Sequence, residues 1–306
     1  MLEEEEQMAN TNMLSKAADS RENQHARRLK KLGRVLQTVA AVLVTMVMAF
    51  PIYWMFITAV KGDNEMMQLM PTLWPESFHW ENFLTVFERI PLWRYLFNTM
   101  VVTFSTMLIE VPTAILAAYG FARGRFKGRD ILFVLVLGAL MIPHQVTFVP
   151  MYLIIAKLGW VDSFPGLILP RIGAAHMTFM LRQNFRSINQ DYLDAGRLDG
   201  LGIVGNITHI MVPMARAAIA TAAMNSFISG WNSYFWPKIL TKSDRTRVLT
   251  IGMMQLRTSW GESHMYEHFN VILAGVFLTV VPVLILFLFN QKNMVKGYAK
   301  MNFKKS

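Results

Sequence analysis

Residues 191–213 read DYLDAGRLDGLGIVGNITHIMVP, a polar, glycine-containing stretch between strongly apolar runs. Its first part has helical spacing, which places Tyr192, Ala195 and Gly196 on one face. Ala195 and Gly196 are small enough to let another backbone approach closely. The pattern therefore predicts a short helix over 190–198.

A chain reversal follows this helix. Asp199-Gly200 is a helix-stop signal, because glycine readily adopts the left-handed conformation at a helix C-terminus. Pro213 fits the first turns of the next helix, where its missing N–H is not needed. An ordinary glycine-rich loop would explain Asp199-Gly200 alone. The full order of acid, small residues, reversal and return favours a short helix lying across a membrane face.

Composition indicates a membrane protein. The chain has 306 residues, of which 53% are hydrophobic and 16% charged, with a mean hydropathy of +0.32. Soluble domains usually carry about 25% charged residues. The net charge of +10 could by itself suggest nucleic acid, but the basic residues cluster beside apolar runs, as membrane topology requires. We therefore expect membrane lipid as a partner and no nucleic acid. Without cysteine, disulfides and thiolate metal sites are excluded.

Six runs approach the roughly 20 apolar residues that a bilayer core needs. Glu110 interrupts the second, Pro143 and Pro150 lie near the outer end of the third, and the fourth is short and contains Arg171. We expect an all-α integral membrane protein whose six transmembrane helices lie at about 35–60, 97–122, 131–149, 166–181, 210–236 and 269–289.

The placement of Lys and Arg predicts the orientation. Basic clusters precede the first span, fill the loop between spans two and three, lie between spans four and five, and occupy the tail. The positive-inside rule makes that side, with both termini, cytoplasmic. The outer loop 237–268 also carries five basic residues, so the asymmetry is incomplete. The predicted parts are a cytoplasmic segment 1–34, a transmembrane domain 35–290 with a loop at 188–210, and a basic cytoplasmic tail 291–306.

The order Asp194-Ala195-Gly196, Asp199-Gly200, Ile210-x-x-Pro213 resembles the cytoplasmic "E-A-A … D-G … I-x-x-P" loop of ABC importer permeases. Other stretches are similar to sugar-importer permeases of the maltose and glycerol-3-phosphate type, namely 117–129, 158–162, 181–188, 230–237 and 296–300. The resemblance covers about residues 35–300. It is strongest to the second type of permease subunit in the carbohydrate class.

The resemblance implies an ABC type I importer permease with a coupling helix between helices four and five. It implies a bacterial inner membrane location, a second homologous permease subunit, an ABC ATPase dimer and an extracytoplasmic solute-binding protein. Because the chain lacks G-x-x-x-x-G-K-[ST], ATP and Mg would bind the partner ATPase. We expect no catalytic residue, metal or cofactor on this chain, which would form half of a pathway that works by alternating access.

The resemblance also assigns residues to ATPase coupling. Asp194 replaces the family's glutamate but keeps its charge, and Gly196 replaces an alanine, which lowers helix propensity by up to about 1 kcal/mol. The second proline of the family is Ala217 here. The predicted coupling residues are Asp191, Leu193, Asp194, Ala195, Gly196, Leu198, Asp199, Gly200 and Pro213.

The substrate pathway is less defined by sequence. An intramembrane carboxylate such as Glu110 is costly to bury and is therefore a site candidate, although a helix contact explains it equally. Polar residues near the spans could bind sugar hydroxyls or bond neighbouring helices, and Trp231 could stack on a sugar or belong to an aromatic belt. Arg171 faces either a polar cavity or, by snorkelling, the interface. The candidates are Asn98, Glu110, Arg171, His176, Asn225, Ser229, Trp231 and Asn232.

Several alternatives stay open. A neutral oligosaccharide, a polyol and a glycerophosphate all fit, and a single intramembrane arginine slightly favours a neutral sugar. A permease for peptides or amino acids is the nearest competitor. A secondary transporter usually shows internal symmetry, and a membrane enzyme needs convergent reactive groups; neither is visible. His264 and His268 have the spacing of a zinc pair, but without a third ligand we expect surface histidines.

Overall fold

The computed structural model describes residues 2–261 and 267–302, which are mainly α-helical and contain no β-strand. The chain divides into two compact units, Met1–Ile57 and Thr58–Ser306.

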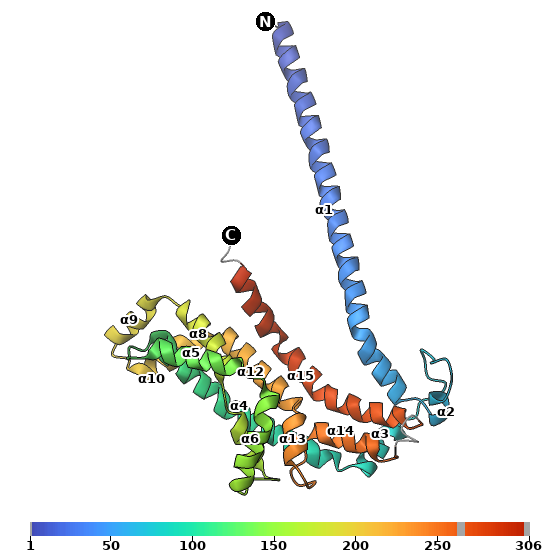
Figure 1. The fold of residues 1–306 in the computed structure, drawn as a ribbon. Helices are drawn as coiled ribbons and strands as arrows, with labels where there is room; N and C mark the ends of the chain where they lie inside the picture. Colours follow the sequence, from blue (N-terminus) through green and yellow to red (C-terminus); the bar gives the residue numbers. More distant parts are fainter. Residues whose placement is uncertain (1, 262–266, 303–306) are drawn as a thin grey trace. The chain divides into compact units, whose positions relative to one another are not determined.

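The first unit contains all but the last two residues of helix α1, which runs from Leu2 to Ala59 without a break (Figure 1). The polar segment before the first apolar run is therefore the start of the same helix. Lys31–Ala59 is long and apolar enough to cross a membrane, in agreement with the first predicted span. Val47 and Met48 are 71% and 73% exposed, as expected of side chains that contact lipid.

The second unit contains long helices joined by short ones (Figure 1). In chain order its elements are α2 (Asp63–Met66), α3 (Glu81–Arg89), α4 (Leu92–Arg123), α5 (Arg129–Leu140), α6 (His144–Lys157), α7 (Phe164–Ile168), the 3₁₀ turn η1 (Leu169–Arg171), α8 (Ala175–Arg186), α9 (Gln190–Leu198), α10 (Ile203–Gly205), the π-helix η2 (Asn206–Met211), α11 (Val212–Met214), α12 (Arg216–Trp231), α13 (Phe235–Leu240), α14 (Leu249–Thr258) and α15 (Phe269–Asn302).

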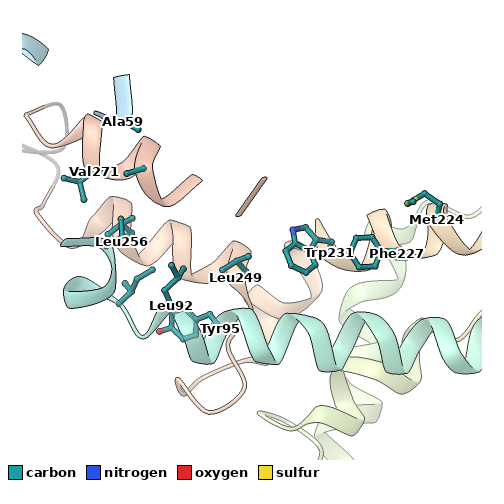
Figure 2. Packing of buried hydrophobic residues seen from close by; sticks show 12 residues of the cluster. Ala59, Leu92, Tyr95, Met224, Phe227, Trp231, Leu249, Leu256 and Val271 are labelled. Atoms are coloured by element: carbon teal, nitrogen blue, oxygen red, sulfur yellow. The ribbon is translucent and has the colours of Figure 1, made fainter. Parts of the chain in front are cut away.

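Helix α4 is the central element of this unit and packs most extensively against α8 and α12. Near its N-terminus, Leu92 and Tyr95 join a buried cluster with Leu249 and Leu256 of α14, and this cluster continues to Trp231 of α12 (Figure 2). Nearer its C-terminus, small residues of α4 pack against large apolar residues of α8, η2 and the α9 segment. One helix therefore links the two ends of the unit.

Close packing fixes the N-terminal end of α4 against α14. A Cβ on Gly252 would lie 2.2 Å from the Tyr95 ring, so only glycine permits this approach. The Tyr95 hydroxyl lies 2.6 Å from the Asp244 carboxylate and 2.7 Å from Oε1 of Gln255. The Oγ1 of Thr99 accepts a hydrogen bond from the Leu249 N–H at 2.8 Å. The start of α14 is therefore held to one face of α4.

Three helices of the described chain are long and apolar enough to span a bilayer: Lys31–Ala59, Leu92–Arg123 and Phe269–Leu288. Two bent pairs would each add one span, giving up to five. These are Arg129–Leu140 with Gln145–Lys157, bent by 101°, and Ile203–Met214 with Arg216–Leu240, bent by 85°. The first, second and sixth predicted spans agree with straight helices of the structure.

The prediction of a continuous third helix over 131–149 is wrong. The helix ends at Leu140 and a second begins at His144. Pro143 explains the break, because proline lacks an N–H and forces the residue before it out of the helical conformation. The fifth span is likewise interrupted, at Ala215, two residues after Pro213.

The predicted fourth helix over 166–181 is also wrong as a single span. The chain forms α7, the turn η1, a non-helical stretch at 172–174, and then α8. Pro170 and Gly173 disfavour a continuous helix here. The twelve residues of α8 extend about 18 Å, well short of the roughly 30 Å of a hydrocarbon core.

Asp162 ties the segment between α6 and α7 to the loop after α13. It adopts a left-handed conformation, with φ +56°. Its carboxylate accepts hydrogen bonds from the backbone N–H groups of Lys242, at 2.9 Å, and Ser243, at 3.2 Å. The hydroxyls of Ser243, at 2.5 Å, and Thr246 also donate to it. Burial by itself raises the pKa of Asp162, but these donors outweigh it and hold the pKa well below its usual range.

This lowered pKa predicts a pH-dependent contribution to stability. Because the folded form binds the proton more weakly than the unfolded form, the stabilisation is complete above about pH 4 and is lost as the pH falls through the depressed folded value. We expect Asp162→Asn to lower the unfolding free energy at pH 7 by about 2 kcal/mol, since bonds to a charged acceptor are lost.

Thermal unfolding of the purified chain in detergent, followed between pH 3 and pH 7, would measure this. Glu88→Gln, which changes an exposed acid with no bonded partner in the described structure, is the matched control. A Tm difference between Asp162→Asn and the unmodified chain that persists unchanged at pH 3 would contradict the assignment.

Candidate functional site

The short helix α9 has clear signals at both ends. At its start, Oδ1 of Asn189 accepts a hydrogen bond from the Asp191 N–H at 3.3 Å. At its end, Gly200 is left-handed with φ +84°. The Leu201 N–H donates to the Gly196 carbonyl at 2.8 Å, and the Gly200 N–H donates to Arg197 at 3.0 Å, which is the Schellman arrangement. The helix and its glycine stop are both as the sequence predicts.

One face of α9 is turned inward. Leu193 is fully buried in a cluster with Phe185, Ile207 and Met211. Gly196 is buried as well, and a Cβ on it would lie 2.5 Å from Cδ1 of Ile210 and 2.9 Å from Oδ1 of Asn206. The glycine that lowers helix propensity is therefore required by close packing.

This packing separates the predicted coupling residues into two groups. Leu193 and Gly196 contact the rest of the chain and position the helix. Tyr192 and Ala195, which the helical spacing predicts on the same face as Gly196, are instead exposed.

The opposite surface, which we call the exposed α9 face, combines acidic and apolar residues. Leu198 is 90% exposed and Tyr192 is 55% exposed. Ile203 and Val204, just beyond the turn, are about 70% exposed. The sequence does not indicate that Ile203 and Val204 are exposed next to α9, because they precede an apolar run and resemble the start of a membrane helix. The face comprises Asp191, Tyr192, Asp194, Ala195, Leu198, Asp199, Ile203 and Val204.

Arg123, the last residue of α4, holds the segment that leads into α9. Its Nη1 donates to Oε1 of Gln190 at 2.8 Å. Its Nη2 donates to the carbonyls of Phe185, at 2.8 Å, and Ile188. Sequence reasoning missed this role, and the only signal was that Arg123 lies in a stretch resembling the sugar permeases. Arg123 therefore connects the C-terminal end of α4 directly to the segment that leads into α9.

The other end of α9 leads into an interrupted helix. Nδ2 of Asn206 donates to the carbonyls of Leu201, at 3.1 Å, and Gly202, at 3.2 Å. A π-helical turn, η2, follows, and such turns occur frequently at functional sites. Pro213 is the second residue of the short helix α11, which ends next to the break at Ala215.

A cavity of about 590 Å³ lies within the same unit. Its walls come from α4, α6, η1, α8, α12 and the start of α13. The polar lining is concentrated on α12, where Asn225, Ser226 and Ser229 follow at helical spacing. Aromatic side chains close one part of the lining, including Phe148, Tyr234, Phe235 and Trp236.

The cavity contains a carboxylate and a guanidinium. Oε2 of Glu110 accepts a hydrogen bond from the Ser226 hydroxyl at 2.5 Å. Nη2 of Arg171 donates to the Ser229 carbonyl at 3.1 Å and to its hydroxyl at 3.4 Å. Arg171 faces this cavity, which decides between the two positions that the sequence allows.

Six of the eight predicted pathway residues line the cavity: Glu110, Arg171, His176, Asn225, Ser229 and Asn232. Asn98 does not, because its Nδ2 donates to the carbonyls of Arg245 and Arg247 at 3.0 and 2.8 Å. Trp231 is 4% exposed in the apolar core, and its Nε1 donates to Thr279 at 3.1 Å. Both are structural residues, which sequence spacing alone could not show.

Of the two histidines predicted to lie on the surface, His264 and His268, the structure describes only His268. His264 lies outside the described residues. Nδ1 of His268 is 3.3 Å from the Asp63 carboxylate, and its ring stacks on Trp260. Within the described residues no group of three or more potential metal ligands occurs.

The two faces of α9 predict opposite results for neighbouring substitutions. Gly196→Leu would force Ile210 and Asn206 to move, and overpacking of this kind costs about 1–3 kcal/mol. Ala195→Leu, one residue earlier on the exposed face, should leave stability within about 0.5 kcal/mol of the unmodified chain. Thermal unfolding in detergent would compare the two, and equal Tm values would show that Gly196 is not closely packed.

Comparisons with known proteins agree with this architecture. Residues 110–293 match the family described as "Binding-protein-dependent transport system inner membrane component". The chain is 33% identical over 285 residues to the probable ABC transporter permease protein YurM of Bacillus subtilis, covering 91% of each chain. It is 29% identical to the sn-glycerol-3-phosphate transport system permease protein UgpE of Yersinia enterocolitica, covering 85% of this chain and 93% of that protein.

A third relative is the arabinooligosaccharides transport system permease protein AraQ of Bacillus subtilis, which is 28% identical over 86% of this chain and 93% of its own. The fold is similar to that of a chain in a crystal structure of a bacterial ABC transporter involved in the import of the acidic polysaccharide alginate. The TM-score is 0.74 at 22% identity, covering 85% of this chain and 96% of that chain. With the family match extending over more than half of the sequence, the chain belongs to the inner membrane components of binding-protein-dependent transport systems, the non-enzymatic permease subunits of ABC transporters.

Proposed function

We propose that this chain forms half of the translocation pathway of an ATP-driven importer for a carbohydrate or a related solute. The observation that carries the proposal is the course of α4. Glu110 of this helix lines the cavity, and Arg123, thirteen residues further on, holds the segment that leads into α9. About 20 Å of continuous helix therefore connects a polar cavity to an exposed docking surface.

The exposed α9 face is the proposed contact with an ABC ATPase. Leu198 and Tyr192 offer apolar area that the chain itself leaves uncovered. Asp194 offers a negatively charged carboxylate. Its Oδ1 accepts hydrogen bonds from Nη1 of Arg197 at 2.8 Å and from Nε2 of Gln190 at 3.0 Å. Since both of these partners are themselves on α9, a basic residue of an ATPase could replace them without disturbing the fold. ATP and Mg bind that ATPase and not this chain.

The proposed cycle is alternating access. Movement of the ATPase dimer displaces α9, and the hydrogen bonds of Arg123 transmit the displacement to α4 and the cavity wall. The bends at 141–143 and at Ala215 are places where helix segments can reorient. A second homologous permease completes the pathway, and an extracytoplasmic solute-binding protein delivers the solute. This scheme requires both termini and α9 to be cytoplasmic, in a bacterial inner membrane.

The cavity has the chemistry of a carbohydrate pathway. Amides and hydroxyls at 225, 226 and 229 of α12, and at 232 and 233 just after its end, extend over about two turns, roughly 12 Å. Glu110 can accept hydrogen bonds from sugar hydroxyls, and Phe235, which is 58% exposed, offers a ring for stacking. Two of the relatives are named for the transport of arabinooligosaccharides and of sn-glycerol-3-phosphate. These names support an oligosaccharide or a sugar-related phosphate over a peptide.

Purification of the tagged chain from its native membrane in mild detergent tests the assembly. We expect mass spectrometry to identify an ABC ATPase and a second permease, with a solute-binding protein after gentle cross-linking. Recovery of this chain without any ATPase after cross-linking would overturn the proposed function.

Substitutions on the exposed α9 face test the docking surface. Leu198→Glu should reduce substrate-stimulated ATP hydrolysis by at least about tenfold, since losing the burial of one leucine costs about 1.5–3 kcal/mol. Asp194→Lys should act in the same direction by reversing a charge. Both chains should still insert, because neither side chain is buried.

The measurement is ATPase activity of the reconstituted complex with and without solute-binding protein and solute. Phe126→Glu, an equivalent change on an exposed loop residue outside the α9 face, is the control. Unchanged stimulation in both α9 variants would refute the docking role.

A further inference from the structure

We propose that the cavity accepts a solute with a negatively charged group, a carboxylate or a phosphate, and that Arg171 is its binding partner. The inference rests on the proposed function, because it names the class of solute for the same cavity. It departs from the preference for a neutral sugar, which followed from a sequence that could not show where Arg171 faces.

The first argument is the unused hydrogen-bonding capacity of Arg171. A guanidinium has five N–H donors in a rigid planar fork and stays charged in proteins. In the described structure only Nη2 donates, to Ser229. Nη1 and Nε have no hydrogen-bond partner among the described residues. A planar fork with free donors matches a carboxylate or phosphate in two-point contact.

The second argument is that Glu110 does not neutralise this arginine directly. Both residues line the cavity, yet no ion pair within 4 Å joins them in the described chain. Glu110 instead accepts the hydrogen bond from Ser226. The negative charge of Glu110 lowers the free-energy cost of placing the Arg171 guanidinium at membrane depth. Because the two groups do not form an ion pair, the remaining N–H donors of Arg171 stay available to a ligand.

The third argument is the position of Arg171 in the fold. It is the last residue of the turn η1, where the helical path is broken before α8 begins. Irregular backbone at membrane depth is tolerated where it lines a polar cavity. This turn brings the arginine to Ser229 of α12, next to the polar residues Asn225 and Asn232. The acidic group would bind at Arg171 while hydroxyls of the same solute reach the α12 side chains and Glu110.

The test uses the complete complex with its solute-binding protein, reconstituted in liposomes. Three probes are compared for ATP-dependent uptake: a galacturonate trisaccharide, sn-glycerol 3-phosphate and maltotriose. We expect uptake of one of the two anionic probes, which also distinguishes a carboxylate from a phosphate. Arg171→Gln should lower the ratio of anionic to neutral uptake by on the order of tenfold or more. Arg171→Lys, which keeps the charge but not the fork, should give an intermediate ratio.

Arg216→Gln, an exposed arginine at the start of α12 outside the cavity, is the matched control and should leave the ratio unchanged. Uptake of neither anionic probe would overturn the inference, as would an anionic uptake that Arg171→Gln leaves intact. Uptake of maltotriose alone would retain the importer but refute the anionic solute. Absence of an ATPase from the complex would instead refute the proposed function.

Discussion

The hydrogen bonds of Arg123 are the interaction on which the proposed coupling between α9 and the cavity depends. They join the C-terminal end of α4, a helix of 32 residues, to the segment that carries α9. The packing of Leu193 and Gly196 against η2 is the second connection between α9 and the rest of the unit. A guanidinium suits this position because its fork can bind several carbonyl groups at once. The exposed α9 face can therefore stay uncovered while the inner side of the helix is held in place.

Interrupted helices are the second constraint. A straight apolar helix can only present side chains to a pathway, whereas a broken one also presents backbone groups and turns. The breaks at 141–143, at 172–174 and at Ala215 all lie near the cavity or the π-helical turn. Such breaks are stable in a membrane only where protein or water satisfies the freed backbone groups. The same feature that reduces the number of straight spans places Arg171 at the cavity wall.

Individual residues show which structural features could be predicted from the sequence and which could not. The ends of α9 could be predicted, because Asn189 and Gly200 act through local backbone geometry. Most of the candidate pathway residues line the cavity, and their role there stays a prediction. Asn98 and Trp231 lie elsewhere, because spacing along a helix does not reveal which neighbour each face contacts. Arg123 was missed because its role depends on contacts between segments far apart in the sequence. Ile203 and Val204 were missed because the sequence does not show that these apolar side chains are exposed.

The sequence by itself determined the membrane location, the permease family and the short helix with its glycine stop. These properties follow from apolar run length, the order of a local motif and the conformational freedom of single residues. Only the tertiary structure decided that Gly196 is closely packed, that Arg171 faces a cavity and that three of the apolar runs are broken or bent. Those outcomes depend on helix rotation and on packing between α4, α8 and α12, which arise from many weak contacts. No single stretch of the chain contains that information.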